Sequence, residues 1–89
     1  MANYPLSIIS PEVKIFEDQV SALTAPGQEG RFGVLAQHAP MITILTRGIL
    51  TVTGLGFEHF FAVSSGILEV NEKGQVQVLA DQVQQAKSF

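Results

Sequence analysis

The clearest hydrophobic pattern lies in the second half of the chain, where short apolar or alternating runs are separated by turn residues. Residues 49–53 are rich in β-branched side chains, residues 57–63 are aromatic and apolar, and residues 75–78 alternate polar with apolar. These patterns are typical of β-strands. Glycine-containing turn segments separate the runs, since glycine readily adopts positive φ, and they lie at residues 54–56, 64–66 and 71–74. Strands at this spacing predict a sandwich or a barrel.

The first half of the chain is ambiguous. Residues 10–12 (Ser-Pro-Glu) have the composition of a helix start, and residues 13–23 carry apolar side chains at helical spacing. Residues 12–15, in contrast, alternate charged and apolar, and an all-β remainder needs strands here to complete two sheets. We therefore predict an all-β fold: a single β-sandwich or flattened barrel of about ten short, mostly antiparallel strands.

Length and composition favour a small subunit over a free-standing protein. The 89 residues contain no internal repeat, and we expect one sandwich domain over residues 1–81 followed by a short polar tail, residues 82–89. Hydrophobic residues make up 46% of the chain and charged residues only 15%, against about 25% in an average soluble domain. There is no cysteine to form a disulfide. Scarce surface charge indicates faces that a partner covers.

Charge and hydropathy exclude other classes. The formal net charge is −3 and the five basic residues are scattered, which argues against nucleic acid as a partner. No apolar run is long enough to span a membrane, and the start of the chain lacks the features of a signal peptide. We expect a chain that is not exported and associates with a membrane only through other proteins, with no direct lipid insertion.

Three stretches carry a resemblance to a known family. Residues 26–40 (Pro-Gly-Gln-Glu-Gly-Arg-Phe-Gly-Val-Leu-Ala-Gln-His-Ala-Pro) are a glycine-punctuated strand and loop that ends in His-Ala-Pro. Residues 64–70 are a small-residue turn followed by a strand that ends in Glu-Val, and residues 76–81 follow in order. Together they resemble the N-terminal β-sandwich domain of the F-type ATP synthase epsilon subunit, called delta in mitochondria. The resemblance covers positions 4–81.

The resemblance implies a function, partners and a location. It implies a non-catalytic rotor subunit of the central stalk, which links gamma to the membrane c-ring and supports the coupling of proton flow to ATP synthesis. It places the chain at the cytoplasmic face of the bacterial inner membrane, as a peripheral part of the complex. One sheet is expected to pack on gamma. The end of the sandwich expected to meet the c-ring carries Ser10, Glu29, Gly30, Arg31 and His38.

Two departures from the family matter. Some members have an acidic residue where this chain has Arg31, which reverses a local charge and implies a compensating change in the ring. Most members also continue into a two-helix hairpin, whereas this chain ends at Phe89, either as a natural short form or as the first domain of a longer protein. In relatives that have it, this hairpin restrains ATP hydrolysis, so we expect the present chain to support coupling without inhibiting the enzyme in that way.

No residue pattern indicates a reaction, and we expect no catalytic residue, cofactor or metal. Residues 27–33 lack the Lys-Ser or Lys-Thr of a phosphate-binding loop. His38 has no nucleophile or metal-ligand spacing with His59, which is expected to be an ordinary strand-face histidine. Two questions stay open: whether Glu69 reaches a partner, and whether the apolar residues at 42, 44 and 45 are core or gamma-facing. The alternative function is a free-standing sandwich that binds a ligand or peptide.

Overall fold

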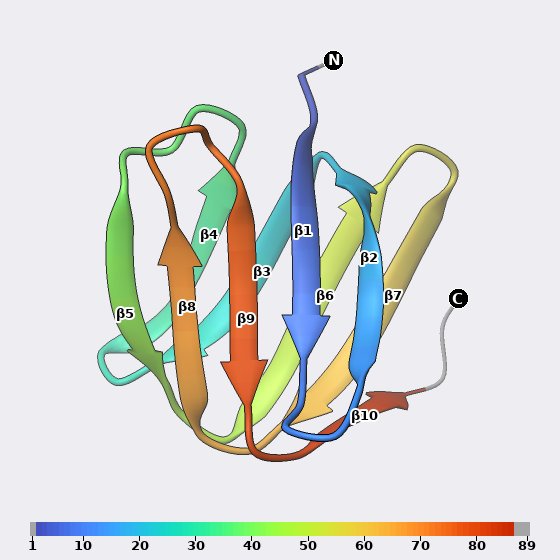
Figure 1. Ribbon diagram of the computed structural model, residues 1–89, viewed down its shortest axis with the longest axis vertical. Coiled ribbons are helices and arrows are strands. Elements are labelled where there is room, and N and C mark those ends of the chain that lie inside the picture. The colour runs from blue at the N-terminus through green and yellow to red at the C-terminus, as the bar shows by residue number, and fades with distance from the viewer. Residues whose placement is uncertain (1, 87–89) are drawn as a thin grey trace.

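The computed structural model describes residues 2–86, and in that range it contains ten strands and no helix (Figure 1). The strands are β1 (Tyr4–Ile9), β2 (Lys14–Val20), β3 (Ala22–Gly27), β4 (Gly30–Leu35), β5 (Met41–Leu45), β6 (Gly48–Gly54), β7 (Phe57–Val63), β8 (Gly66–Val70), β9 (Val76–Ala80) and β10 (Val83–Ala86). The predicted all-β sandwich is confirmed. No helix long and apolar enough to cross a membrane is found in this part of the chain.

The strands form two layers, one in front of the other in Figure 1. One layer contains β5, β8, β9, β1 and β2 in that order, and the other contains β4, β3, β6, β7 and β10. All pairs are antiparallel except β1 with β9. The layers are joined where the end of β3 pairs with the end of β5, at Gly27 opposite Leu45. This junction is called the corner below.

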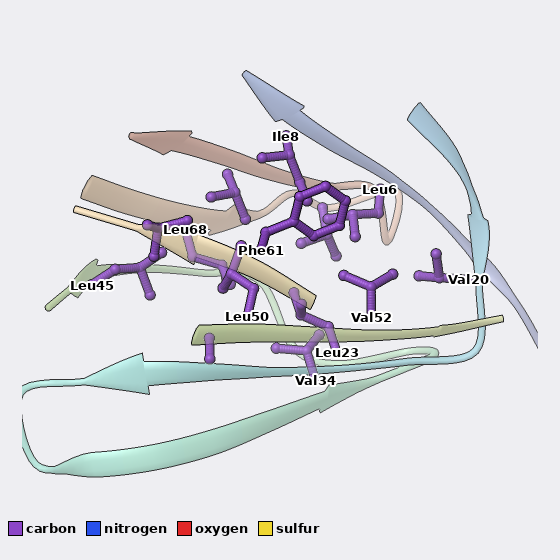
Figure 2. Packing of buried hydrophobic residues seen from close by; sticks show 14 of the residues in the cluster. Leu6, Ile8, Val20, Leu23, Val34, Leu45, Leu50, Val52, Phe61 and Leu68 are labelled. Atoms are coloured by element: carbon purple, nitrogen blue, oxygen red, sulfur yellow. The ribbon is translucent and has the colours of Figure 1, made fainter. Parts of the chain in front are cut away.

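The core lies between the layers because alternate residues of most strands point inward. Phe61 is its largest fully buried side chain, and both layers supply leucine, isoleucine and valine around it (Figure 2). Leu45 is fully buried, whereas Ile42 and Ile44 in the same strand are 69% and 54% exposed. The open question about these residues is therefore answered: Leu45 is core, and the two isoleucines point outward.

One buried hydrogen bond ties the two layers together. Tyr4 in β1 donates its hydroxyl to the backbone carbonyl of Val34 in β4, at 2.7 Å. Tyr4 is 3% exposed and Val34 is fully buried. Burial raises the pKa of the Tyr4 hydroxyl to about 12. The chain's single tyrosine thus satisfies a carbonyl on the edge strand of the opposite layer.

The segment with helical spacing forms two strands instead. Ser10 closes a turn after β1, with its backbone N–H donating to the Val13 carbonyl at 3.0 Å. Phe16 then packs at the side of the sandwich against the ring of Phe61, with ring centroids 5.6 Å apart. His59 lies in the same aromatic cluster, stacked on Phe57 at 4.9 Å. Packing against a distant strand decided the conformation here, not local helix propensity.

The end of the chain differs from the predicted domain boundary. Residues 83–86, which the sequence analysis assigned to the tail, form β10 and pair with β7 from Val83 opposite Val63 to Ala86 opposite Phe60. A four-residue polar strand carries almost no hydrophobic pattern, because backbone pairing with β7 holds it in place. Residues 87–89 of the predicted tail lie outside the described residues.

Candidate partner-binding surfaces

The β3–β4 hairpin presents the first candidate surface. Gly27 pairs with Gly30 across a two-residue loop, Gln28-Glu29. Gly30 has φ +118°, a conformation that L side chains rarely adopt. A Cβ on Gly27 would lie 3.0 Å from the ring of Phe32. The two glycines therefore allow a tight turn that holds Gln28 and Glu29 exposed at the tip.

Four of the five residues expected at the ring line one hollow beside this hairpin. Glu29, Gly30, Arg31 and His38 all border it, and β4 and β5 form its sides. His38 follows Gln37, whose φ of 66° turns the chain from β4 toward β5. The His38 Nδ1 atom lies 2.8 Å from the carbonyl oxygen of Ala39. This contact holds the imidazole against its own loop.

Ser10 lies at the same end of the sandwich as the hairpin tip, but in the other layer. It borders a second hollow on the outer face of the β5-β8-β9-β1 layer, together with Ile44, Ile67, Leu79 and Ser65. His38, in contrast, lies in the connection that precedes β5, at the opposite end of the sandwich from the hairpin tip, which pairs with the last residue of β5 (Figure 1). The sequence could not place these residues relative to one another, because strand pairing joins residues far apart in the chain.

A row of four apolar side chains crosses the outer face of this layer. Strand register places Ile44 opposite Ile67, Ile67 opposite Leu79, and Leu79 opposite Ile9. Ile44 is 54% exposed, and Ile67 and Leu79 are each 43% exposed. Of the four, the sequence analysis singled out only Ile44. The other three lie next to Leu68, Val78 and Ile8, which point inward, so the alternation of a strand could have predicted that they point outward. Their alignment in one row could not have been predicted.

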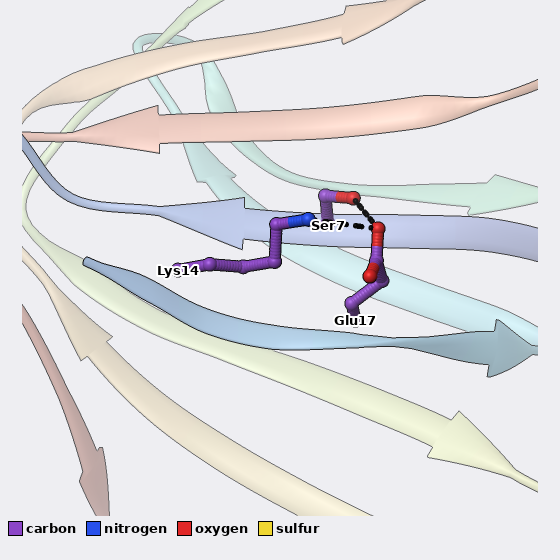
Figure 3. A network of polar contacts seen from close by, with 3 residues as sticks. All are labelled: Ser7, Lys14 and Glu17. Atoms are coloured by element: carbon purple, nitrogen blue, oxygen red, sulfur yellow. Dashed lines mark hydrogen bonds and ion pairs between the residues drawn. The ribbon is translucent and has the colours of Figure 1, made fainter.

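The neighbouring row on the same face is polar apart from Ile42. Ile42 is opposite Glu69, Glu69 opposite Gln77, and Gln77 opposite Ser7. Ser7 donates to Glu17 at 3.5 Å, and Lys14 pairs with the same carboxylate oxygen at 3.0 Å (Figure 3). Such an exposed pair contributes little to stability, about 0 to 1 kcal/mol. The face therefore changes from polar to apolar toward the Ser10 end.

Within residues 2–86, no three His, Cys, Asp or Glu side chains are grouped so that they could hold a metal ion. The side chain of Glu69 makes no hydrogen bond or ion pair in this range, so it remains available on the surface. The side chain of His59 makes a polar contact with Gln85 at 3.2 Å. Outer surfaces, not an enclosed cavity, carry the distinctive residues of this fold.

These features define a small two-layer β-sandwich with an exposed hairpin tip and an apolar row on its outer surface. The family model for the ATP synthase Delta/Epsilon chain, beta-sandwich domain, matches residues 3–86. The chain belongs to this family.

Curated relatives and solved structures agree with that assignment. The chain is 47% identical to an ATP synthase epsilon chain of Rhodopseudomonas palustris (strain HaA2) and 46% identical to one of Bradyrhizobium sp. (strain BTAi1 / ATCC BAA-1182). Each match covers 91% of this chain but 59% of the relative. The chain thus spans about three fifths of the length of these relatives.

Two solved assemblies contain a similar domain. A chain in the cryo-EM structure of the Euglena gracilis mitochondrial ATP synthase, OSCP/F1/c-ring in rotational state 1, matches with a TM-score of 0.88 and 29% identity. That match covers 96% of this chain and 54% of the other. A chain in the Tetrahymena thermophila mitochondrial ATP synthase structure (central stalk/c-ring) matches with a TM-score of 0.82 over 93% of this chain and 66% of the other. At 12% identity, the second likeness is one of fold.

Proposed function

We propose that this chain is a non-catalytic subunit of the central stalk of a proton-translocating F-type ATP synthase, where it joins gamma to the c-ring. The observation that carries the proposal is the family match over residues 3–86, which spans all ten strands. The overlay with a chain of the Euglena F1/c-ring assembly supports it. In a bacterium, the complex would hold the chain at the cytoplasmic face of the inner membrane.

The two candidate surfaces would serve different partners. The exposed tip of the β3–β4 hairpin, with Glu29, Gly30 and Arg31, is the surface we assign to the polar loops of the ring, and His38 borders the same hollow. The apolar row of Ile9, Ile44, Ile67 and Leu79 is the surface we assign to gamma, because exposed apolar side chains gain most from burial in a stable interface. Ser10 borders that row, so we assign it to the gamma side.

The ring contact can be tested by crosslinking, since the natural chain has no cysteine to interfere. Glu29→Cys should form a disulfide with a cysteine placed in the polar loop of the ring, in the reconstituted complex. Leu55→Cys is the matched control, because Leu55 is 94% exposed but lies at the β6–β7 turn, at the opposite end of the sandwich from the hairpin tip (Figure 1). Crosslinks from Leu55 in place of Glu29 would show that the proposed orientation is reversed.

The gamma contact can be tested with a charge in the apolar row. Ile67→Lys should leave the fold intact but weaken binding to purified gamma by about a hundredfold, because a lysine would be buried without a partner. Ile49→Lys is the control, since Ile49 is also partly exposed but lies in β6 of the other layer. A parent chain that does not bind gamma at all would favour the alternative, a free-standing binding module.

A further inference from the structure

The guanidinium of Arg31 makes two hydrogen bonds within the domain. It donates from Nη1 to the backbone carbonyl of Ile49 at 2.7 Å, and from Nη2 to the hydroxyl of Thr24 at 2.8 Å. Arg31 belongs to β4, Thr24 to β3 and Ile49 to β6. Because β3 lies between the other two strands, one side chain ties three neighbouring strands together.

The position of these bonds explains why an arginine is needed there. The β3–β6 ladder ends at Thr24 opposite Thr51, and continuing that register would place Pro26 opposite Ile49. Proline has no backbone N–H, so it cannot donate to the Ile49 carbonyl. Arg31, which is opposite Pro26 in β4, supplies the missing donor.

The same place is the corner of the sandwich. Beyond the end of its ladder with β6, β3 turns to β5: the Pro26 carbonyl accepts from the Thr46 N–H at 3.0 Å, and Gly27 pairs with Leu45. The hairpin tip follows directly after this change of neighbour, and β4 pairs with no strand other than β3 within residues 2–86. Few other contacts therefore fix the direction of the tip.

We propose that Arg31 is a positioning residue that fixes the β3–β4 hairpin at the corner. Glu29, at the tip itself, is exposed and makes no hydrogen bond or ion pair within residues 2–86, so its carboxylate is available to a partner. The inference that this positioning serves the ring contact rests on the proposed function. This assignment adds a role within the domain to the sequence-based expectation that Arg31 faces the ring.

Three variants separate a positioning role from a charge role. Arg31→Lys keeps the charge, but its ammonium cannot reproduce the planar fork that serves two acceptors on different strands. Thr24→Val removes one acceptor and changes no charge. Thr51→Val is the matched control, since Thr51 is opposite Thr24 and its hydroxyl makes no hydrogen bond among the described residues.

The first readout is amide hydrogen exchange of residues 28–31 in the isolated chain, which needs no partner. Arg31→Lys should accelerate exchange there about fivefold or more, because a segment opens more readily when the hydrogen bonds that restrain it are removed. Thr24→Val should accelerate it less, and Thr51→Val should leave it unchanged. Exchange at the parent rate in both Arg31→Lys and Thr24→Val would overturn the proposal, since the bonds would then restrain nothing.

The second readout is the rate of crosslinking of Glu29→Cys to the ring, with and without Arg31→Lys. A rate that falls several-fold in the double variant supports positioning for the ring contact. An unchanged rate despite faster exchange would overturn the functional part of the inference. If Glu29→Cys never crosslinks in the otherwise unaltered chain, while exchange responds to Arg31→Lys as expected, then the ring assignment fails and the internal role of Arg31 stands.

Discussion

Replacing Tyr4 by phenylalanine tests how the two layers of the sandwich are held together. The ring would stay in the core, but the Val34 carbonyl would lose the donor that now lies 2.7 Å away. Since both residues are buried, water cannot easily replace that donor. Leaving a buried acceptor unpaired costs about 1 to 3 kcal/mol. We expect the free energy of unfolding to fall by about 1.5 kcal/mol, within that range.

Urea denaturation followed by circular dichroism measures this change. At an m value of about 1.5 kcal/mol/M, the expected loss lowers the midpoint by about 1 M. A midpoint within about 0.3 M of the parent, at unchanged m, would mean a loss below about 0.5 kcal/mol. That result would refute the argument that the hydroxyl satisfies an otherwise isolated carbonyl.

The same hydroxyl makes a second, independent test possible through pH. Burial raises the pKa of Tyr4 from 10.0 in the unfolded chain to about 12 in the folded one. The folded state therefore favours the protonated phenol, and this contribution is complete below pH 10 and is lost as pH rises toward 12. Two pKa units correspond to at most about 2 to 3 kcal/mol. Unfolding of the parent chain should be more sensitive to alkali than that of Tyr4→Phe.

Spectroscopy can follow this ionisation directly, because the chain has one tyrosine and no tryptophan. The near-ultraviolet absorbance of tyrosinate should rise with a midpoint well above 10 while circular dichroism still reports a folded chain. A midpoint near 10 with the fold intact would show that the hydroxyl is not buried.

Three further predictions concern two strand glycines, the aromatic cluster and nucleotide binding. Gly66→Ala should destabilise the domain by about 2 kcal/mol, because its methyl group would overlap the Leu79 carbonyl and lie 2.9 Å from the Ala80 Cα. Gly33→Ala is the control: the nearest atom to its methyl group would be 3.8 Å away, so the urea midpoint should change little. Phe16→Ala should cost about 2 kcal/mol in the same assay, because it removes the ring that packs on Phe61; an unchanged midpoint would mean that β2 does not depend on this contact. Calorimetric titration of the chain with ATP should give no heat of binding, since no phosphate-binding loop is present, and stoichiometric micromolar binding would contradict the proposed role.

Most of the fold could be predicted from the sequence because the second half follows the two-residue period of strands. The turn at residues 71–74 shows how local the signal is: Asn71 accepts from the N–H groups of Lys73 and Gln75, both at 2.9 Å, and Gly74 has φ +80°. All of these residues are neighbours in the chain. Where structure is fixed by neighbours in sequence, composition is enough to recognise it.

The features that could not be predicted from the sequence depend on contacts between distant residues. Val83–Ala86 forms a strand because it pairs with the edge of β7, and its own residues carry no strand pattern. His38 was grouped with the hairpin tip, but it lies in the connection before β5, whereas the tip lies beside the end of β5. The internal hydrogen bonds of Arg31 could not be predicted, because its acceptors lie 7 and 18 residues away, in other strands. Each of these features depends on segments that only the tertiary structure places relative to one another.

The parallel pairing of β1 with β9 also has a consequence for how the domain is made. Leu6 in β1 lies opposite Val76 in β9, so the ladder between these two strands cannot form until β9 has been synthesised. Until then β1 and β2 can form only a hairpin, which is marginal in water on its own. Pairings between residues so distant slow folding. We therefore expect this domain to fold after its synthesis is nearly complete, with the residues of β1 exposed to chaperones in the interval.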